Sequence, residues 1–313
     1  MTSATRSVQY VEIDPDRAGQ RLDNFLMARL RSAPRSLVYR IVRKGEVRVN
    51  RSRVSPSYRL QAGDSVRIPP VRLEAPQEGG DSALGQRLQR CVLHEDEDLL
   101  VLDKPAGVAV HGGTGIAVGV IEALREVHPH WQGLELVHRL DRATSGCLVL
   151  ARNRRAMAWL NEVFRDHLAD KRYLALVAGQ WPDDLREIDA PLAREQEVRG
   201  ERDMVVDEAG KRAVTRFTPV QRFARATLLE VTIVTGRTHQ IRAHCAHAGH
   251  PLGGDPRYGD VAFNRELRAL KCKRMFLHAH RLGLPMPDGE MQTFHAPLDA
   301  QLRGLVDHFE GAN

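Results

Sequence analysis

The 313-residue sequence contains little cysteine and no long apolar run. No run approaches the ~18 apolar residues of a membrane-spanning helix, and the first residues lack the apolar core of a signal peptide. The four cysteines form no Cys-x-x-Cys pair and no regular framework, which predicts reduced thiols. We therefore expect a globular cytoplasmic protein of one or two domains, with no membrane partner.

The sequence also lacks several motifs of cofactor and metal sites. The glycine-rich residues 111–115 have neither the Lys-Ser/Thr of a phosphate-binding loop nor a Gly-x-Gly-x-x-Gly pattern. Histidines gather between 239 and 250, and His244 and His247 share a predicted helix face, but no His-Glu-x-x-His arrangement is present. We expect no metal and no organic cofactor; a zinc hydrolase that uses these histidines is the alternative.

Positive charge is concentrated near the N-terminus. Residues 17–70 contain 13 Lys/Arg and 3 Asp/Glu, a balance of +10 in a chain whose total is +6, so the remainder carries −4. This asymmetry predicts an N-terminal polyanion-binding domain attached to a second domain with a different function. Apolar spacing predicts helices over 21–30 and 36–44, followed by strands over 46–50 and 60–68.

Two basic helices followed by short strands resemble the S4 RNA-binding domain. Guanidinium groups on helix faces can bind phosphates through paired hydrogen bonds, which gives salt-dependent binding with little sequence preference. A merely solvated basic face is the alternative. The residues expected to contact RNA here are Arg21, Arg40, Arg43, Lys44 and Arg48. The predicted organisation is a lead-in at 1–16 with a strand at 8–13, an S4-like domain at 17–70, a linker at 71–90 and a second domain at 91–313.

The second domain carries a dense charged motif before a predicted strand. Residues 138–146 read His-Arg-Leu-Asp-Arg-Ala-Thr-Ser-Gly and lead into an apolar segment. Asp141 lies between Arg139 and Arg142 in sequence, and nearby positive charge would keep its carboxylate ionised. Such an aspartate alone is more typical of a structural ion pair than of a catalyst.

Three further motifs follow it along the chain. Lys-Arg-Tyr at 171–173 opens a predicted strand, Thr-Gly-Arg-Thr-His-Gln-Ile-Arg at 235–242 leads into a helix predicted from about 238 to 249, and Phe-Leu-His-Ala at 276–279 lies in an apolar strand. Helices are also predicted over 121–128 and 156–168 and strands over 214–218 and 227–234, while 180–212 reads as a long excursion.

In this order, after an S4-like domain, the four motifs resemble those of the RluA-type pseudouridine synthases, over nearly the whole chain. The resemblance implies an α+β fold, with a catalytic domain built on a mixed, mainly antiparallel β-sheet flanked by helices. It implies isomerisation of uridines in 23S ribosomal RNA, the RNA of the large subunit. We expect a monomer, since nothing in the sequence demands an oligomer. A non-catalytic rRNA-binding or ribosome-assembly factor, or a synthase acting on another RNA such as tRNA, remains the alternative.

The resemblance also implies roles for individual residues. Asp141 matches the essential carboxylate, Arg242 its basic partner, and Tyr173 the ring that stacks on the target base. Arg139 matches the arginine that enters the space left by the flipped uridine, and Leu277 lines the pocket; Arg237 and His239 are expected to contact RNA.

These residue types suit the isomerisation of uridine. An ionised carboxylate can attack the ribose or base, or move a proton, and a tyrosine ring gives the unstacked base a flat contact. Whether the carboxylate attacks C1′, adds to C6 or initiates glycal formation stays open.

Overall fold

The computed structural model describes residues 8–30, 33, 35–71, 82–112, 118–195 and 203–311. The chain divides into two compact units, one comprising Met1–Asp81 and Gly112–Val118 and the other Ser82–His111 and Gly119–Asn313. Within the described ranges, no helix is long and apolar enough to cross a membrane.

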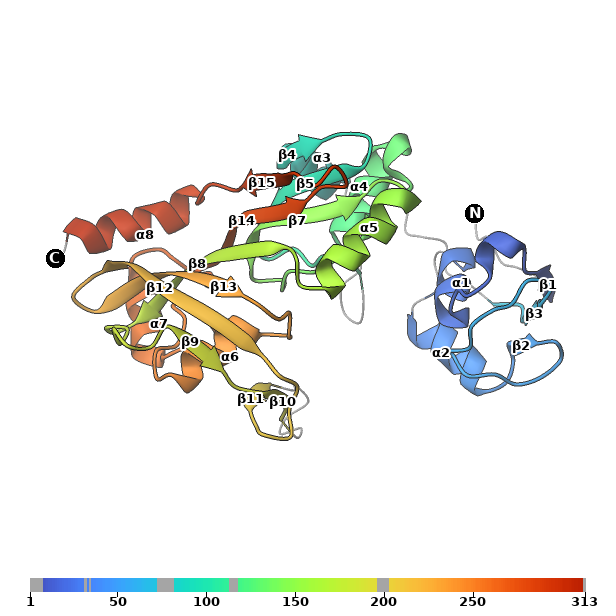
Figure 1. Ribbon diagram of the computed structural model, residues 1–313, viewed down its shortest axis with the longest axis horizontal. Helices are drawn as coiled ribbons and strands as arrows, with labels where there is room; N and C mark the ends of the chain where they lie inside the picture. Colours follow the sequence, from blue (N-terminus) through green and yellow to red (C-terminus); the bar gives the residue numbers. More distant parts are fainter. Residues whose placement is uncertain are drawn as a thin grey trace. The chain divides into compact units, whose positions relative to one another are not determined.

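The first unit packs two helices on a small antiparallel sheet (Figure 1). Leu22, Phe25 and Leu26 of the first helix are fully buried, as the i, i+3, i+4 spacing predicts. Strand order is β1-β3-β2, so the strand at the end of the predicted lead-in belongs to this sheet. The elements are β1 (Gln9–Glu12), η1 (Pro15–Arg17), α1 (Leu22–Arg29), α2 (Arg35–Arg43), β2 (Arg48–Val49) and β3 (Ser65–Ile68).

The second unit is built on a mixed sheet in the order β4-β5-β7-β14-β8-β13-β12-β9, with β15 on β14 and β6 on β7. Only β7 and β14 run parallel; the other pairs are antiparallel. The sheet strands are β4 (Val92–Glu95), β5 (Leu99–Lys104), β6 (Glu135–Leu136), β7 (Ser145–Ala151), β8 (Asp170–Ala178), β9 (Glu187–Asp189), β12 (Val214–Arg222), β13 (Ala226–Ile233), β14 (Leu277–Pro285) and β15 (Met291–His295). This confirms the predicted α+β class.

Helices cover this sheet and bury its centre. Every residue of β7 is buried, which explains why its sequence is apolar without alternation. Helix α5 joins the core formed by β5, β7, β14 and β15, while α7 and α8 join the core with β8 and β13. The helices are α3 (Ser82–Gln89), α4 (Val120–Val127), η2 (Pro129–Trp131), α5 (Arg154–Arg165), α6 (Gln240–His247), α7 (Val261–Ala269) and α8 (Ala300–Gly311).

Several predicted boundaries differ from the structure. The segment predicted as a linker contains α3, which packs against α4 so closely that a Cβ on Gly85 would collide with the Ala123 backbone oxygen. Residues 72–81 of that segment, and 113–115 of the glycine-rich one, lie outside the described residues. The predicted excursion over 180–212 forms β9 and a separate pair, β10 (Leu192–Arg194) with β11 (Met204–Val206).

Gly146 lies where the two halves of the larger sheet meet. It pairs with Ala279 where β7 meets β14, and its φ of +109° lies in the region that favours glycine. A Cβ at this position would collide with the backbone of Ala279. Gly146 is therefore required by the close approach of β7 and β14. Strand β7 begins at the end of the Asp141 motif, and β14 begins at Leu277.

Candidate active site

A cavity of about 110 Å³ opens where the loop before β7, strand β8 and the start of α6 meet. Its lining contains every residue of the catalytic unit for which the sequence predicts a site role: Arg139, Asp141, Tyr173, Arg237, His239, Arg242 and Leu277. These residues come from four separate segments of the chain, so the fold brings together what the sequence places up to 138 positions apart.

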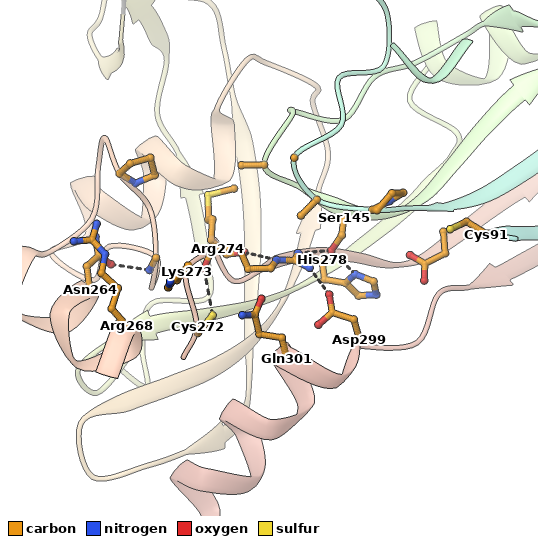
Figure 2. A pocket seen from close by; sticks show the side chains of 18 of the residues that line it. Cys91, Ser145, Asn264, Arg268, Cys272, Lys273, Arg274, His278, Asp299 and Gln301 are labelled. Atoms are coloured by element: carbon orange, nitrogen blue, oxygen red, sulfur yellow. Dashed lines mark hydrogen bonds and ion pairs between the residues drawn. The ribbon is translucent and has the colours of Figure 1, made fainter. Parts of the chain in front are cut away.

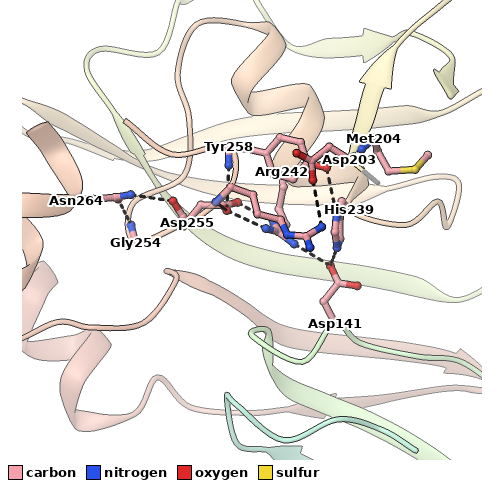
Figure 3. A network of polar contacts seen from close by, with 10 residues as sticks. Asp141, Asp203, Met204, His239, Arg242, Gly254, Asp255, Tyr258 and Asn264 are labelled. Atoms are coloured by element: carbon pink, nitrogen blue, oxygen red, sulfur yellow. Dashed lines mark hydrogen bonds and ion pairs between the residues drawn. The ribbon is translucent and has the colours of Figure 1, made fainter. Parts of the chain in front are cut away.

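Asp141 lies on the loop before β7, with its side chain 21% exposed. Its Oδ2 atom is 3.8 Å from Nη1 of Arg242 and 3.9 Å from Nε2 of His239 (Figure 3). Of the two arginines that flank Asp141 in sequence, Arg139 lines the same cavity, while Arg142 donates through Nε to the backbone oxygen of Gly107. The guanidinium found within 4 Å of the Asp141 carboxylate is that of Arg242 on α6.

Arg242 is fixed by a second carboxylate, that of Asp255. Its Nε and Nη2 atoms donate to the two oxygens of Asp255 at 2.7 and 2.8 Å, and both side chains are almost fully buried. The guanidinium also lies over the Tyr258 ring, 4.9 Å from its centroid. Burial alone would raise the pKa of Asp255, but the hydrogen bonds and the charge of Arg242, together with the amides of Arg257 and Tyr258, outweigh burial and hold that pKa below its usual value.

His239 has left-handed backbone angles, φ 53° and ψ 21°, and precedes the first residue of α6. The helix predicted from about 238 therefore begins at Gln240. The Nδ1 atom of His239 lies 3.1 Å from the hydroxyl of Tyr258, which accepts a hydrogen bond from the Met204 amide. Burial lowers the pKa of His239 despite the nearby Asp141 carboxylate, so an uncharged ring faces the cavity at neutral pH.

Tyr173 and Leu277 form a buried wall of the cavity, on the neighbouring strands β8 and β14. Burial raises the pKa of the Tyr173 hydroxyl, and the negative charge of Asp141 raises it further. The hydroxyl therefore keeps its proton at neutral pH and can donate a hydrogen bond within the cavity.

Lys104 braces the loop from behind. It is fully buried at the end of β5, and its Nζ donates to the backbone oxygens of Pro105 (3.0 Å), Val108 (2.9 Å) and Arg142 (3.4 Å). Burial, and secondarily Arg274, lowers its pKa to about 7, although Asp141 and Asp103 oppose the shift. The lysine thus connects the turn after β5 to the residue after Asp141.

The sequence of the catalytic unit matches one family. The sequence model described as RNA pseudouridylate synthase matches residues 98–247, and the S4 domain matches residues 20–66. A protein of Haemophilus ducreyi named ribosomal large subunit pseudouridine synthase C is 49% identical over 304 residues, which cover 96% of this chain and 95% of its own. The chain belongs to the RNA pseudouridine synthase family. The predicted resemblance is confirmed, and isomerisation of uridine to pseudouridine in RNA is the activity of this enzyme.

Another relative and a solved structure are similar to this chain over most of its length. The protein of the same name from Escherichia coli K12 is 47% identical over 318 residues, covering 100% of both chains. Among solved structures, the human RNA pseudouridylate synthase domain containing 4 has a TM-score of 0.61 at 25% identity, covering 73% of this chain and 96% of its own.

Three residues that shape this pseudouridine synthase site have no role among the predictions from sequence: Lys104, Asp255 and Tyr258. Asp255 and Tyr258 lie in a Gly-Gly-Asp-Pro-Arg-Tyr-Gly segment after α6, and the signal for Asp255 was an acidic residue within a segment of turn formers. The histidine cluster does not converge. His244 lies 2.8 Å from the Thr215 hydroxyl and 3.0 Å from the Ala190 oxygen, and the described residues hold no group of three or more ligands suited to a metal ion.

In the S4 unit, the predicted RNA-contact residues are exposed but not equivalent. Arg21 donates to both oxygens of buried Asp23 at 3.1 and 2.7 Å, and Arg48 donates to the backbone oxygens of Gly45 and Arg51. Within the described residues, the side chains of Arg40, Arg43 and Lys44 at the end of α2 have no carboxylate within 4.0 Å. These three cations are the ones left for an external anion.

Proposed function

We propose that this enzyme isomerises uridines of large-subunit ribosomal RNA in the cytoplasm, as a monomer and without a metal or organic cofactor. The observation that carries the proposal is the near-identical length and 47–50% identity shared with proteins named for that substrate. The basic S4 unit supports a large polyanionic substrate.

Asp141 is proposed to be the essential group in the rearrangement. The C1′–N1 bond breaks, a C1′–C5 bond forms, and the proton displaced from C5 is balanced by one gained at N1, so no redox partner or water is consumed. Arg242 lies 3.8 Å from the Asp141 carboxylate and orients it. Because Asp255 holds Arg242 in place, the charge facing Asp141 is fixed before substrate enters.

The remaining cavity residues are proposed to hold the extruded base. A cavity of about 110 Å³ is well below the ~300 Å³ of ordinary ligand pockets, which suits one planar base. Tyr173 supplies the ring that stacks on it and Leu277 an apolar wall. Arg139 is exposed at the cavity and is proposed to occupy the space that the uridine leaves, while Arg237 and His239 contact the adjoining RNA.

The S4 unit is proposed to hold the RNA backbone through Arg40, Arg43 and Lys44. Arg21 and Arg48 belong to the same unit but already have partners within the chain. These two residues therefore contribute less to RNA affinity than the three at the end of α2.

Tritium release from 5-³H-uridine-labelled RNA tests the proposal. Unmodified 23S rRNA and a tRNA transcript would be assayed in EDTA with wild type, Asp141→Asn and Asp166→Asn, the last an exposed carboxylate paired with Arg165. We expect release from 23S rRNA by wild type and Asp166→Asn, with Asp141→Asn slower by at least about 10³-fold. Tritium release from tRNA but not from 23S rRNA would contradict the proposed substrate. Tight binding of 23S rRNA with no tritium release, whether the rRNA is naked or in precursor particles, would favour a binding factor.

A further inference from the structure

A second and larger cavity, of about 710 Å³, lies behind the loop that carries Asp141. Ala143 and Ser145 of this segment line it, whereas Asp141 and Thr144 line the active-site cavity. The other walls come from the turn after β5, from α7, from residues 272–275 and from the start of α8 (Figure 2). The isomerisation chemistry uses none of these groups.

The opening of this rear cavity is basic. Arg87, Arg268 and Lys273 are exposed and line it, and in the part of the chain that the structure describes none of them has a carboxylate within 4.0 Å. Unpaired cations around one concave surface favour an anionic ligand, because a bound anion would offset their mutual repulsion.

The lining of the rear cavity holds one more cation and two acids. Arg274, with its side chain 15% exposed, pairs with Asp299 and donates to the Ser145 hydroxyl at 2.5 Å (Figure 2). Burial, reinforced by Asp299, raises the pKa of Asp103 to about 6. Four cations thus face two carboxylates, one of which Arg274 already neutralises, and the net charge of the lining stays positive.

The size and lining of the rear cavity narrow the ligand class. Its volume far exceeds that of a phosphate ion and lies within the roughly 300–1,000 Å³ of small-molecule sites. Pro105, Pro256 and Met275 offer apolar contact for a sugar. The lining has no Phe, Tyr or Trp on which a base could stack, and both ring nitrogens of His278 already face Ser145 and the Ala296 oxygen.

We propose that the rear cavity binds ribose–phosphate units of the RNA backbone, without selecting the base. A free ribonucleotide offers the same chemistry, but the lack of a stacking ring favours backbone recognition. The proposal rests on the substrate being RNA and does not depend on which RNA it is.

Hydrogen bonds connect the lining of the rear cavity to the residues that position the catalytic groups. Asn264 lines the rear cavity, donates through Nδ2 to the Asp255 backbone oxygen and accepts from the Gly254 amide. Asp255 in turn holds Arg242. A backbone segment bound behind the loop would therefore contact the elements that position both Asp141 and its basic partner.

The salt dependence of RNA binding tests this site in the full chain. The Kd for an unmodified 23S rRNA transcript would be measured between about 50 and 200 mM KCl for wild type, Arg268→Ala/Lys273→Ala and Arg265→Ala. Arg265 is exposed on the same helix as Arg268 but does not line the cavity. We expect the slope of log Kd against log salt to fall by about 2 in the double variant and by markedly less in the control. Thermal unfolding would confirm that all three proteins are folded.

Titration with UMP, AMP and uridine distinguishes the source of the phosphate. A free ribonucleotide is the ligand of the rear cavity if UMP and AMP bind equally and uridine does not bind. This binding should be lost in Arg268→Ala/Lys273→Ala and kept in Arg265→Ala. Such a result would support the site even if the salt slope of RNA binding were unchanged. An unchanged slope together with no nucleotide binding would overturn the proposal, as would strong preference for one base. Tritium release tests the substrate separately, so failure of that assay leaves these binding results interpretable.

Discussion

The guanidinium of Arg242 lies closer to Asp255 than to Asp141. Asp255 receives two hydrogen bonds from it at 2.7 and 2.8 Å, whereas the Oδ2 atom of Asp141 is 3.8 Å away. One carboxylate therefore anchors the arginine and the other remains available to substrate. This division of roles leads to the first prediction.

Asp255→Asn should destabilise the protein. The change leaves the buried charge of Arg242 without its counter-charge, and breaking a buried pair costs about 3–5 kcal/mol. Urea unfolding would measure this, with Asp203→Asn as the control, because Asp203 pairs with Arg257 at a partly exposed position where such pairs contribute about 0–1 kcal/mol. Equal loss in both variants would contradict the anchoring role.

The stability of the protein should depend on pH through Lys104. In the unfolded chain this lysine keeps its proton up to about pH 10.5, whereas in the folded protein its pKa is lowered to about 7. Between these values the unfolded state binds more protons, so the contribution of Lys104 to stability rises with pH. The difference in unfolding free energy between wild type and Lys104→Met should grow by up to about 1.4 kcal/mol per pH unit in this window. A difference that does not vary with pH would contradict the lowered pKa.

The S4 unit should contribute a measurable share of the salt dependence of RNA binding. Replacing Arg40, Arg43 and Lys44 together by alanine removes three cations with no carboxylate within reach among the described residues. The slope of log Kd against log salt should fall by about 2–3. Arg17→Ala serves as the control, since Arg17 already pairs with Asp14 at 3.3 Å; a similar fall in that variant would mean that any surface charge suffices.

Gly146→Ala should be far more damaging than Gly107→Ala. Both glycines have positive φ, +109° and +86°, which costs an alanine about 1–2 kcal/mol. A Cβ on Gly146 also meets the Ala279 backbone, whereas one on Gly107 meets nothing within 4 Å. We expect at least about 3 kcal/mol of lost unfolding free energy for the first variant; equal costs would show that the two strands can separate freely.

The site could be predicted in part because its residues lie in short, recognisable motifs. Asp141 and Arg242 each belong to one, and the resemblance of the ordered motifs to the RluA-type pseudouridine synthases predicted that these two residues act together. The anchoring of Arg242 by Asp255 could not be predicted, since it depends on how the turn after α6 folds back. The hydrogen bond from Arg142 to the backbone oxygen of Gly107 could not be predicted for a related reason, because Gly107 is a neighbour only in the folded chain.

Among the elements, long periodic segments were predicted well and short ones poorly. Helix α5 and strands β8 and β13 lie close to their predicted ranges, because each buries a continuous apolar face. Helix α3 was missed inside a presumed linker, since its eight residues include Gly85 and gain their stability from contact with α4.

The pairing of Gly146 with Ala279 also bears on how this enzyme can vary. Asp141 lies a short turn before β7, and Leu277 is the first residue of β14. The main-chain pairing of these two strands therefore sets the spacing between the Asp141 carboxylate and the Leu277 side chain that lines the cavity. Apart from the glycine required at 146, that spacing depends on peptide groups rather than on side-chain identity. Substitutions that alter how tightly RNA is held can therefore accumulate around the cavity while the geometry of the reaction stays constant.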